Sequence, residues 1–312
     1  MLWDTDQVIV LDDADVRRLL EPATAVAAVR DSLIAHHAGG LIAPARLLAG
    51  LGGGDLVFTA GRLKGTGYGF RAYDTMPTTG SDQITVVYEE SSGRLAGAIT
   101  GDYLGAARTG AIGAVAVDVL ARPDAGILAL IGSGTQAWTQ AWAIRAVRPL
   151  REVRVYSRDP GRRSAFAQRA ADELGLPATA VADPAAALAG ADIVVLATSS
   201  RTPVIQAEWV GVAGVHVSTL GPKLAGAHEC PVELAGRSDV ILTDSPAQLG
   251  AYRQPFFLDA ATRERIGALG AAAAGQGQRR TSLDQVTLFC SVGLAGTEVA
   301  VAAALLDAAA GR

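Results

Sequence analysis

Short apolar runs alternate with helical stretches through the second half of the chain. The runs GILALI, DIVVLAT and DVILTD begin at residues 126, 192 and 239, and polar segments with helical spacing follow many such runs. Strands that are apolar on both faces are typical of a parallel sheet covered by helices on both sides. This half of the chain therefore predicts a doubly wound parallel α/β sheet.

The first third of the chain has a different pattern. Helices are expected at 12–20, 22–39 and 102–122. Between residues 46 and 100, short β-rich runs are separated by glycine and polar turns, which is typical of antiparallel strands. This part predicts a smaller α+β domain that precedes the parallel sheet.

Composition narrows the class of protein. Half of the 312 residues are hydrophobic and 19% are charged, so a large core is expected, and the net charge of −4 argues against a nucleic-acid partner. The apolar last helix contains Glu298 and Asp307, which favours burial or packing in an oligomer over a membrane span. The start of the chain does not resemble a signal peptide, and Cys230 and Cys290 match no metal or redox spacing, so we expect a cytoplasmic protein with reduced thiols.

A glycine loop follows the first strand of the expected parallel sheet. The stretch IGSGTQA places Gly132 and Gly134 between an apolar run and a helix, with Ala137 in the third position of a Gly-x-Gly-x-x-Gly pattern. The first glycine permits a tight turn, the second lets the backbone approach a pyrophosphate, and the helix N-terminus attracts negative charge. The alternative is an ordinary glycine-rich turn, which would not require a strand before it and a helix after it. The loop, with Ser133, Thr135 and Gln136, predicts a dinucleotide site.

The end of the second strand indicates which dinucleotide. NAD-binding proteins usually place an acidic residue there for the ribose 2′-hydroxyl, but this chain has Ser157 and Arg158, followed by Arg162 and Arg163. Guanidinium groups are suited to a 2′-phosphate. We interpret Asp159 as the N-cap of the next helix. The sequence therefore favours NADP over NAD.

Several separated stretches resemble the ornithine cyclodeaminase/μ-crystallin family. They are APARLL, GAARTGAIGAVA, IGSGTQA, ADIVVLATSS and LFCSVGLAGTEVA, which occur in the family's order over nearly the whole chain. The resemblance implies a homodimer in which a Rossmann domain, residues 123–291, is inserted into a substrate and dimerisation domain formed by 1–122 and 292–312. It also implies hydride transfer between a nicotinamide and the carbon of an amine or imine.

The resemblance extends the expected cofactor site. It implies further contacts from the ends of the later strands. The expected residues are Ala197, Thr198, Ser199, Leu220, Gly221, Ser291 and Val292.

Two arginines are candidates for holding a substrate carboxylate. Arginine binds carboxylates through two parallel hydrogen bonds. Arg46, in APARLL, and Arg108, in GAARTG, stand where the family pattern has its substrate-binding arginines. Surface salt bridges are the alternative explanation for both.

The chain departs from the family pattern at two positions. Arg71, in GYGFRAYD, replaces a lysine, and Lys223, in TLGPKLAGAHE, replaces an aspartate, while Gly226 and Glu229 match the rest of that motif. Arg71 stays protonated, so it can bind substrate or polarise an imine but cannot readily move a proton. We expect nearby cations such as Arg71 and Arg108 to lower the pKa of Lys223, so that it can exchange a proton with the substrate nitrogen. Binding a cofactor phosphate or pairing with Glu229 is the alternative role.

These residues predict an NAD(P)-dependent oxidoreductase acting on the C–N bond of a small imine or amine with a carboxylate. A substrate with an extra acid group, or an apolar one, suits the two added cations. Two other functions remain open at this point: an ammonia-lyase that recycles its dinucleotide, and a non-catalytic NADP-binding protein similar to μ-crystallin. The four histidines show no metal-ligand spacing, so no metal is expected.

Overall fold

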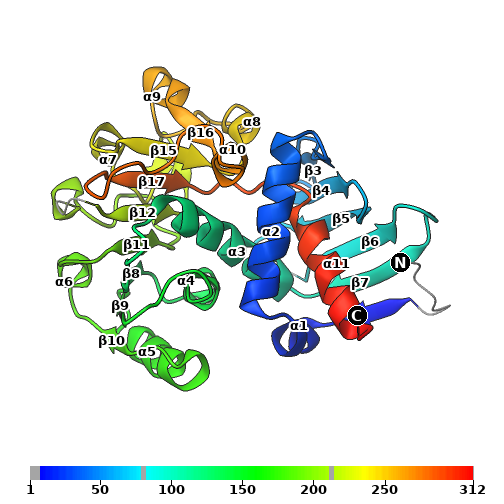
Figure 1. The fold of residues 1–312 in the computed structure, drawn as a ribbon, viewed down its shortest axis with the longest axis horizontal. Helices are drawn as coiled ribbons and strands as arrows, with labels where there is room; N and C mark the ends of the chain where they lie inside the picture. The colour runs from blue at the N-terminus through cyan, green and yellow to red at the C-terminus, as the bar shows by residue number, and fades with distance from the viewer. Residues whose placement is uncertain (1–7, 79–81, 211–213, 312) are drawn as a thin grey trace. The chain divides into compact units, whose positions relative to one another are not determined.

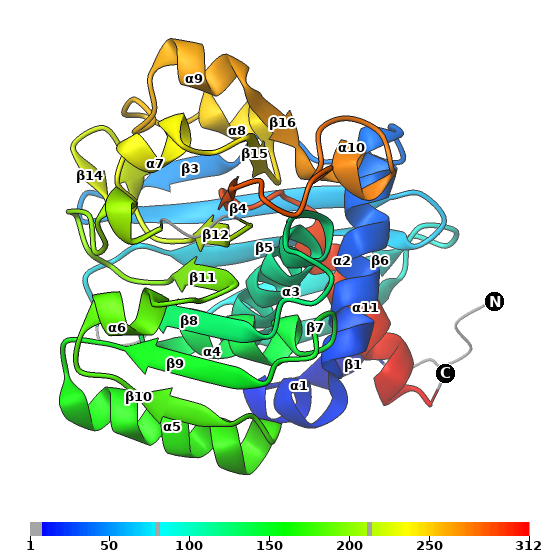
Figure 2. The same cartoon turned by 60° about the vertical axis from the view of Figure 1, so that its left-hand side comes forward.

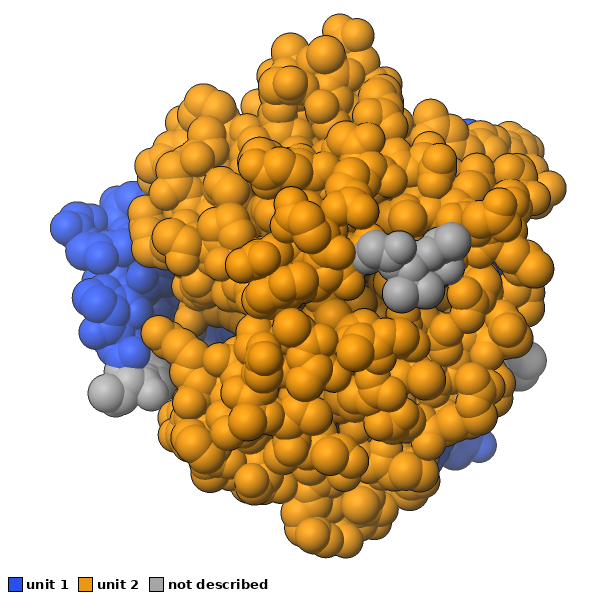
Figure 3. All heavy atoms as spheres, turned by 90° about the vertical axis from the view of Figure 1, so that its left-hand side faces the viewer, with its two compact units in different colours: residues 1–108, 294–312 blue, residues 109–293 orange. Residues whose placement is uncertain are grey.

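The computed structural model describes residues 8–78, 82–210 and 214–311 (Figure 1). The chain divides into two compact units, coloured separately in Figure 3. Unit 1 consists of residues 1–108 and 294–312, and unit 2 consists of residues 109–293. The sequence had suggested boundaries at 122 and 292.

Unit 1 is a seven-stranded sheet with helices on one side. Its strands are β1 (Ile9–Leu11), β2 (Leu41–Ile42), β3 (Leu47–Gly50), β4 (Asp55–Leu63), β5 (Gly67–Asp74), β6 (Ile84–Glu89) and β7 (Leu95–Thr100). Its helices are α1 (Asp13–Leu19), α2 (Pro22–His37) and α11 (Thr297–Ala309). The strand order is β1-β7-β6-β5-β4-β2, with β3 also paired to β4. All these pairs are antiparallel except β1 with β7, so the antiparallel sheet expected for residues 46–100 gains a parallel edge from the start of the chain.

Helix α11, the last in the chain, packs directly on the sheet of unit 1. It contacts β4, β5, β6 and β7, and α2 packs against it (Figure 1). Most of its residues are buried, and most of the buried ones are apolar; Glu298 is charged and is also buried. One carboxylate is therefore held against the centre of the sheet.

Unit 2 is an eight-stranded sheet in which every pair is parallel (Figure 2). Its strands are β8 (Ile127–Ile131), β9 (Glu152–Tyr156), β10 (Ala178–Ala180), β11 (Ile193–Leu196), β12 (His216–Thr219), β15 (Val240–Thr243), β16 (Ile266–Ala268) and β17 (Thr287–Cys290). Its helices are α4 (Thr135–Ile144), α5 (Pro160–Leu174), α6 (Pro184–Leu188), α7 (Glu233–Gly236), α8 (Pro246–Leu249), α9 (Ala260–Glu264) and α10 (Leu269–Ala273), with a 3-10 turn η1 (Ala207–Trp209). A small hairpin is formed by β13 (Lys223–Leu224) and β14 (Ala227–His228).

The strand order of unit 2 creates a switch point. The order is β10-β9-β8-β11-β12-β17-β15-β16, so β9 and β10 lie on one side of β8 and the strands from β11 onward lie on the other, with β17 inserted between β12 and β15. Ligands of such sheets bind outside the carboxyl ends of the strands at this point. The predicted doubly wound α/β fold is confirmed.

Helix α3 (Tyr103–Leu120) begins in unit 1 and ends in unit 2. Of the helices in the described part of the chain, it alone is long and apolar enough to cross a membrane, and 83% of that window is buried inside the structure. Such burial is typical of a core helix.

Candidate functional site

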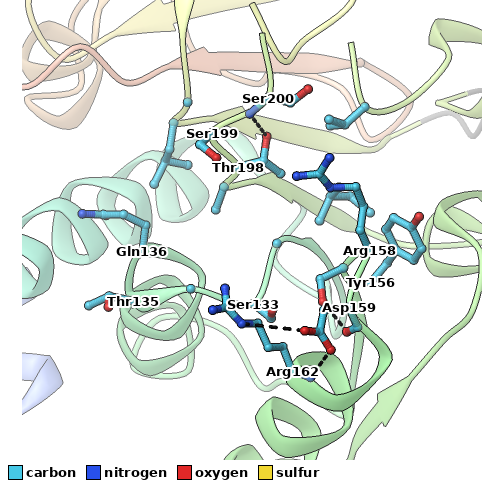
Figure 4. A pocket seen from close by; sticks show the side chains of 18 of the residues that line it. Ser133, Thr135, Gln136, Tyr156, Arg158, Asp159, Arg162, Thr198, Ser199 and Ser200 are labelled. Carbon is cyan, nitrogen blue, oxygen red and sulfur yellow. Dashed lines mark hydrogen bonds and ion pairs between the residues drawn. The ribbon is translucent and has the colours of Figure 1, made fainter. Parts of the chain in front are cut away.

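A cavity of about 1060 Å³ lies at the carboxyl ends of β8, β9, β11 and β12 in unit 2 (Figure 4). It is lined by Ile131, Gly132, Ser133, Gly134, Thr135, Gln136, Tyr156, Ser157, Arg158, Asp159, Arg162, Ala197, Thr198, Ser199, Ser200, Thr202, Val204, Leu220 and Gly221. These include all the residues expected to bind the cofactor except Ser291 and Val292. Sequence reasoning did not anticipate Ser200, Thr202 or Val204, which follow the expected Thr198 and Ser199.

The glycine loop has the geometry that the sequence suggested. Gly132 has a φ of 125°, and a Cβ atom there would lie 2.2 Å from the carbonyl oxygen of Ala197. Gly134 is the N-cap of α4, and a Cβ atom there would meet nothing within 4 Å. The backbone at Gly134 is therefore open to a ligand, and the first turn of α4 offers backbone N–H groups to an anion.

The loop after β9 turns arginine side chains toward the cavity. Asp159 caps α5, because its carboxylate accepts a hydrogen bond from the backbone N–H of Arg162 at 3.1 Å. Arg158 and Arg162 line the cavity, whereas Arg163 donates to the carbonyl oxygen of Ser157 at 2.8 Å. Figure 4 shows Arg158 beside Tyr156, with Thr198–Ser200 across the cavity from Arg162. Two guanidinium groups thus line the cavity where the second strand ends, and the Nε of Arg162 lies 4.0 Å from Oδ2 of Asp159.

A buried carboxylate joins two of the loops that line this cavity. Glu229 is fully buried, and its Oε2 accepts hydrogen bonds from the backbone N–H and the hydroxyl of Thr198 at 2.8 and 2.7 Å. Its Oε1 accepts from the hydroxyl of Thr219 at 2.9 Å and from the backbone N–H groups of Leu220 and Gly221 at 3.0 and 2.5 Å. Glu229 therefore fixes the loop after β11 to the loop after β12. Sequence reasoning matched Glu229 to a motif but gave it no such role.

Lys223 lies next to the same loop. Its side chain is buried, and its ammonium donates a hydrogen bond to the carbonyl oxygen of Gly221 at 2.5 Å. Burial lowers the pKa of Lys223, while the negative charges of Glu229 and Asp244 oppose the shift. The expected direction of the pKa shift is present, but its cause is loss of water rather than neighbouring arginines. The proton-transfer role of Lys223 stays a prediction.

The segment after β17 is fixed by a second buried carboxylate. Asp244, which follows β15, accepts hydrogen bonds from the backbone N–H groups of Val292 and Gly293, each at 2.7 Å. Ser291 and Val292 therefore have a defined position, although neither lines the cavity.

In unit 1, Arg71 projects from the centre of the sheet toward the face covered by α11. On β5 it lies opposite Thr59 of β4 and Thr85 of β6, and residues opposite one another in antiparallel strands share a face. Its Nε donates to Oε1 of Gln83 at 2.9 Å, its Nη2 donates to the same oxygen, and its guanidinium lies 4.5 Å from the centre of the Tyr73 ring.

Two other arginines act on Arg71 electrostatically. Burial, followed by the charge of Arg108 and more weakly that of Arg46, lowers the pKa of Arg71 to about 10, while Glu298 opposes the shift. The structure thus brings Arg46, Arg71 and Arg108 into one cluster with Glu298, which we call the arginine cluster. These are the three residues that the sequence assigned to substrate binding.

Glu298 is the residue of this cluster that sequence reasoning missed. It is fully buried, its Oε1 accepts a hydrogen bond from the hydroxyl of Thr59, and its Oε2 lies 3.7 Å from Nη2 of Arg108. Burial alone would raise the pKa of Glu298, but Arg108, Thr59 and Arg71 outweigh it, and the net shift is downward. The available signal was an acid in an otherwise apolar helix, which had been attributed only to burial or oligomer packing.

The described residues contain no group of three or more His, Cys, Asp or Glu side chains placed to hold a metal ion. His216 is buried between the hydroxyls of Thr287 and Ser218, each at 2.9 Å. His228 stacks on Phe257 and contacts the carbonyl oxygen of Cys230.

Comparisons with known proteins agree with these features. The model of the ornithine cyclodeaminase/mu-crystallin family matches residues 62–312. The chain is 32% identical over 231 residues to Δ1-pyrroline-2-carboxylate reductase of Bacillus cereus, covering 72% of this chain and 70% of that protein. It is 33% identical over 231 residues to iminosuccinate reductase of Paracoccus denitrificans, covering 73% and 71%.

Solved structures show the same fold. The Paracoccus enzyme in complex with NAD+ has a TM-score of 0.84 at 26% identity, with 97% of both chains covered. An archaeal alanine dehydrogenase dimer with bound NAD has a TM-score of 0.86 at 26% identity, covering 97% of this chain and 96% of that one.

Proposed function

Because the chain belongs to the ornithine cyclodeaminase/mu-crystallin family, we propose that it is a nicotinamide-dependent oxidoreductase that reduces the C=N bond of a small imine carrying a carboxylate. The names of two relatives describe reduction of pyrroline-2-carboxylate and of iminosuccinate, both of which are imines with a carboxylate. In this chain the proposal rests on the arginine cluster, whose guanidinium groups are suited to carboxylate binding.

The two units supply different parts of the proposed chemistry. The cavity of unit 2 has the residues to hold a dinucleotide: an open backbone at Gly134, the N-terminus of α4 and polar loops fixed by Glu229. The bound dinucleotide would supply the hydride for the imine carbon. In unit 1, Arg46 and Arg108 would hold the acid group and so orient the C=N bond. Lys223 or water would supply the proton at nitrogen.

We further propose that NADPH is preferred over NADH. Arg158 and Arg162 line the cavity where the second strand ends, and Asp159, which also lines it, uses one carboxylate oxygen to cap α5. The preference is tested by the ratio of kcat/KM with NADPH to that with NADH in Arg158→Ala. We expect the ratio to fall roughly tenfold, because a hydrogen bond to a charged group is lost. Arg169→Ala, on α5 and outside the cavity lining, is the control.

We also propose that the protein is a homodimer joined through the sheet of unit 1. Six large hydrophobic side chains are exposed on the face opposite α11: those of Val10, Ile42, Leu47, Tyr68, Ile84 and Leu95. An apolar face of this kind is typical of an interface, and a second copy would cover it with the same face.

The dimer is tested by mass measurement in solution. Ile84→Glu should shift the mass toward that of a monomer, because it places charge on this face. Val232→Glu, an exposed apolar position of unit 2, should leave the mass unchanged. A wild-type mass equal to one chain would contradict the proposal.

The activity is tested by incubating the protein with NADPH or NADH and a panel of cyclic imines and of 2-oxo acids with ammonia or methylamine. We expect reduced-nicotinamide absorbance to fall in proportion to the amine formed. Ammonia release from diamino acids without net absorbance change would instead indicate a lyase. Tight cofactor binding with no turnover of any substrate would indicate a binding protein.

A further inference from the structure

We propose that Glu298 is a positioning residue that acts through Arg108. It balances the charge of the Arg108 guanidinium without forming a hydrogen bond to it, so that the guanidinium can still donate to a substrate carboxylate. The proposal rests on the function proposed above, in which Arg108 orients the acid group of the substrate, and it assigns a role to the carboxylate of the last helix.

The first argument is the distance between the two charges. The Oε2 atom of Glu298 lies 3.7 Å from Nη2 of Arg108, and both side chains are buried. Hydrogen bonds between such groups are about 2.7–2.9 Å long, so this pair is electrostatic. Among the described residues, Oε2 of Glu298 and Nε of Arg108 are buried without a hydrogen-bond partner. A buried donor without a partner is costly, so a ligand that supplies an acceptor is favoured here.

The second argument is that Thr59 holds the carboxylate in this position. Its hydroxyl donates a hydrogen bond to Oε1 of Glu298, and Thr59 itself lies in the middle of β4. Without that bond, both carboxylate oxygens would be able to turn toward Arg108, since a guanidinium and a carboxylate fit together through two parallel hydrogen bonds. Such a pair would occupy the donors that we assign to the substrate. The hydroxyl of Thr59 therefore keeps the two charges apart.

The third argument is that the backbone allows α11 to begin very close to β4. A Cβ atom on Gly61, two residues after Thr59, would lie 2.3 Å from Cα of Gly296, which is the N-cap of α11. Gly296 also has a φ of 84°, a conformation that favours glycine. A side chain on Gly61 would push the start of α11 away from the strand. The two glycines thus allow Glu298, in the first turn of α11, to reach the hydroxyl of Thr59.

The charge on Glu298 has a second effect. Burial raises the pKa of Glu298, but Arg108, the hydrogen bond from Thr59 and the charge of Arg71 outweigh it, so that the net shift is downward. The carboxylate is therefore negatively charged near neutral pH, and it repels a substrate carboxylate while it holds Arg108. This repulsion weakens binding of the acid group and so favours release of the product.

The proposal is tested with two substitutions that should change carboxylate binding in opposite directions. Binding of propionate to the protein loaded with NADP+ is measured by calorimetry. Glu298→Gln should lower the Kd for propionate roughly three- to tenfold, because it removes a negative charge close to the guanidinium. Thr59→Val keeps every charge but releases Oε1 of Glu298 toward Arg108, so the Kd should rise. A purely structural role would raise the Kd in both variants.

Two controls accompany these variants. Asp307→Asn makes the same acid-to-amide change near the other end of α11, outside the arginine cluster, and should leave the Kd unchanged. Arg108→Met should abolish propionate binding, and adding Glu298→Gln to it should restore none, because Glu298 acts through Arg108. Thermal unfolding identifies any variant that loses stability. If Glu298→Gln does not fold, the direction of the change in Thr59→Val still decides.

The rate of imine reduction gives a second readout. In Glu298→Gln the amide oxygen would keep the hydrogen bond from Thr59, so the amide NH2 group would face the donors of Arg108 and displace them. We expect kcat to fall roughly tenfold or more, because a small misplacement of an orienting group slows a reaction strongly. The KM should fall in the same variant, since the acid group binds more tightly.

The outcomes separate this proposal from the function on which it rests. If imines are reduced but the Kd for propionate changes in the same direction in both variants, or in neither, the role of Glu298 is wrong and the reductase function stands. An unchanged kcat in Glu298→Gln, or no propionate binding by the wild-type protein and Glu298→Gln, also overturns the role. If the Kd changes in opposite directions and no imine is reduced, the role is supported and the reductase function is wrong.

Discussion

The substitution Glu229→Gln tests whether one buried carboxylate holds the cofactor cavity together. The glutamate oxygens accept five hydrogen bonds from the loops after β11 and β12. Glutamine replaces the two acceptor oxygens with one carbonyl oxygen and one amide NH2 group, which only donates. The best arrangement keeps the oxygen toward Thr219, Leu220 and Gly221 and turns the amino group toward Thr198.

The expected loss in the free energy of unfolding follows from this arrangement. The Thr198 hydroxyl can rotate to accept from the amino group, but the Thr198 backbone N–H then faces another donor. An unpaired backbone group costs about 1–3 kcal/mol, and the three remaining bonds lose their charged acceptor, so we expect a loss of about 2–4 kcal/mol in the free energy of unfolding. The midpoint of thermal unfolding should fall by roughly 5–15 °C.

The assay combines stability with cofactor binding. Fluorescence of the buried Trp138 and Trp142 on α4 reports unfolding of unit 2, and a titration with NADPH gives the Kd. Because Thr198, Leu220 and Gly221 line the cavity, we expect the Kd to rise at least tenfold. Glu233→Gln, four residues further on and exposed, is the control. A loss below 1 kcal/mol, or an unchanged Kd despite lower stability, would refute the reasoning.

Three further predictions concern unit 2. Lys223→Met should lower kcat about 100-fold with the NADPH Kd unchanged if its ammonium donates the proton, and near-wild-type turnover would contradict that role. Gly132→Ala should destabilise the fold in thermal unfolding, since its Cβ atom meets the Ala197 carbonyl, whereas Gly134→Ala should keep the stability and weaken NADPH binding in the same titration. Burial, with Arg280 and Arg148, lowers the pKa of His216 from 6.5 to about 3, so between these pKa values the unfolded chain binds a proton that the folded chain does not. The free energy of unfolding should therefore fall by about 4 kcal/mol as the pH drops from 6.5 to 3, and a His216→Gln variant with the same pH slope in urea unfolding would exclude this cause.

Local patterns predicted the elements and the cofactor loop, because these depend on neighbours in the sequence. The Gly132 turn, the Asp159 cap and the arginines after β9 all follow from spacing within a few residues. The segment after α10 is fixed instead by distant contacts, because Arg280 donates to the carbonyl oxygens of Leu120 and Gly214.

Contacts over long sequence distances could not be read from the sequence. The Oε1 of Glu298 is held by Thr59, more than 200 residues earlier, and nothing local to either residue signals the other. The same holds for Glu229, whose carboxylate is matched to backbone N–H groups, which every residue type except proline provides. Side chains that bind the backbone of distant loops leave little trace in composition or periodicity.

The position of Glu298 also has a consequence for how the chain is made. Residues 294–312 complete unit 1, yet they are synthesised after all of unit 2. Until they emerge from the ribosome, the sheet of unit 1 lacks α11, and the arginine cluster lacks its internal carboxylate. Unit 2 can fold first because its chain is continuous, whereas residues 1–108 can complete their fold only after residues 294–312 have been synthesised. The arginine cluster is therefore a late product of folding, and loss of the last helix would remove it while leaving the residues of the cofactor cavity in the chain.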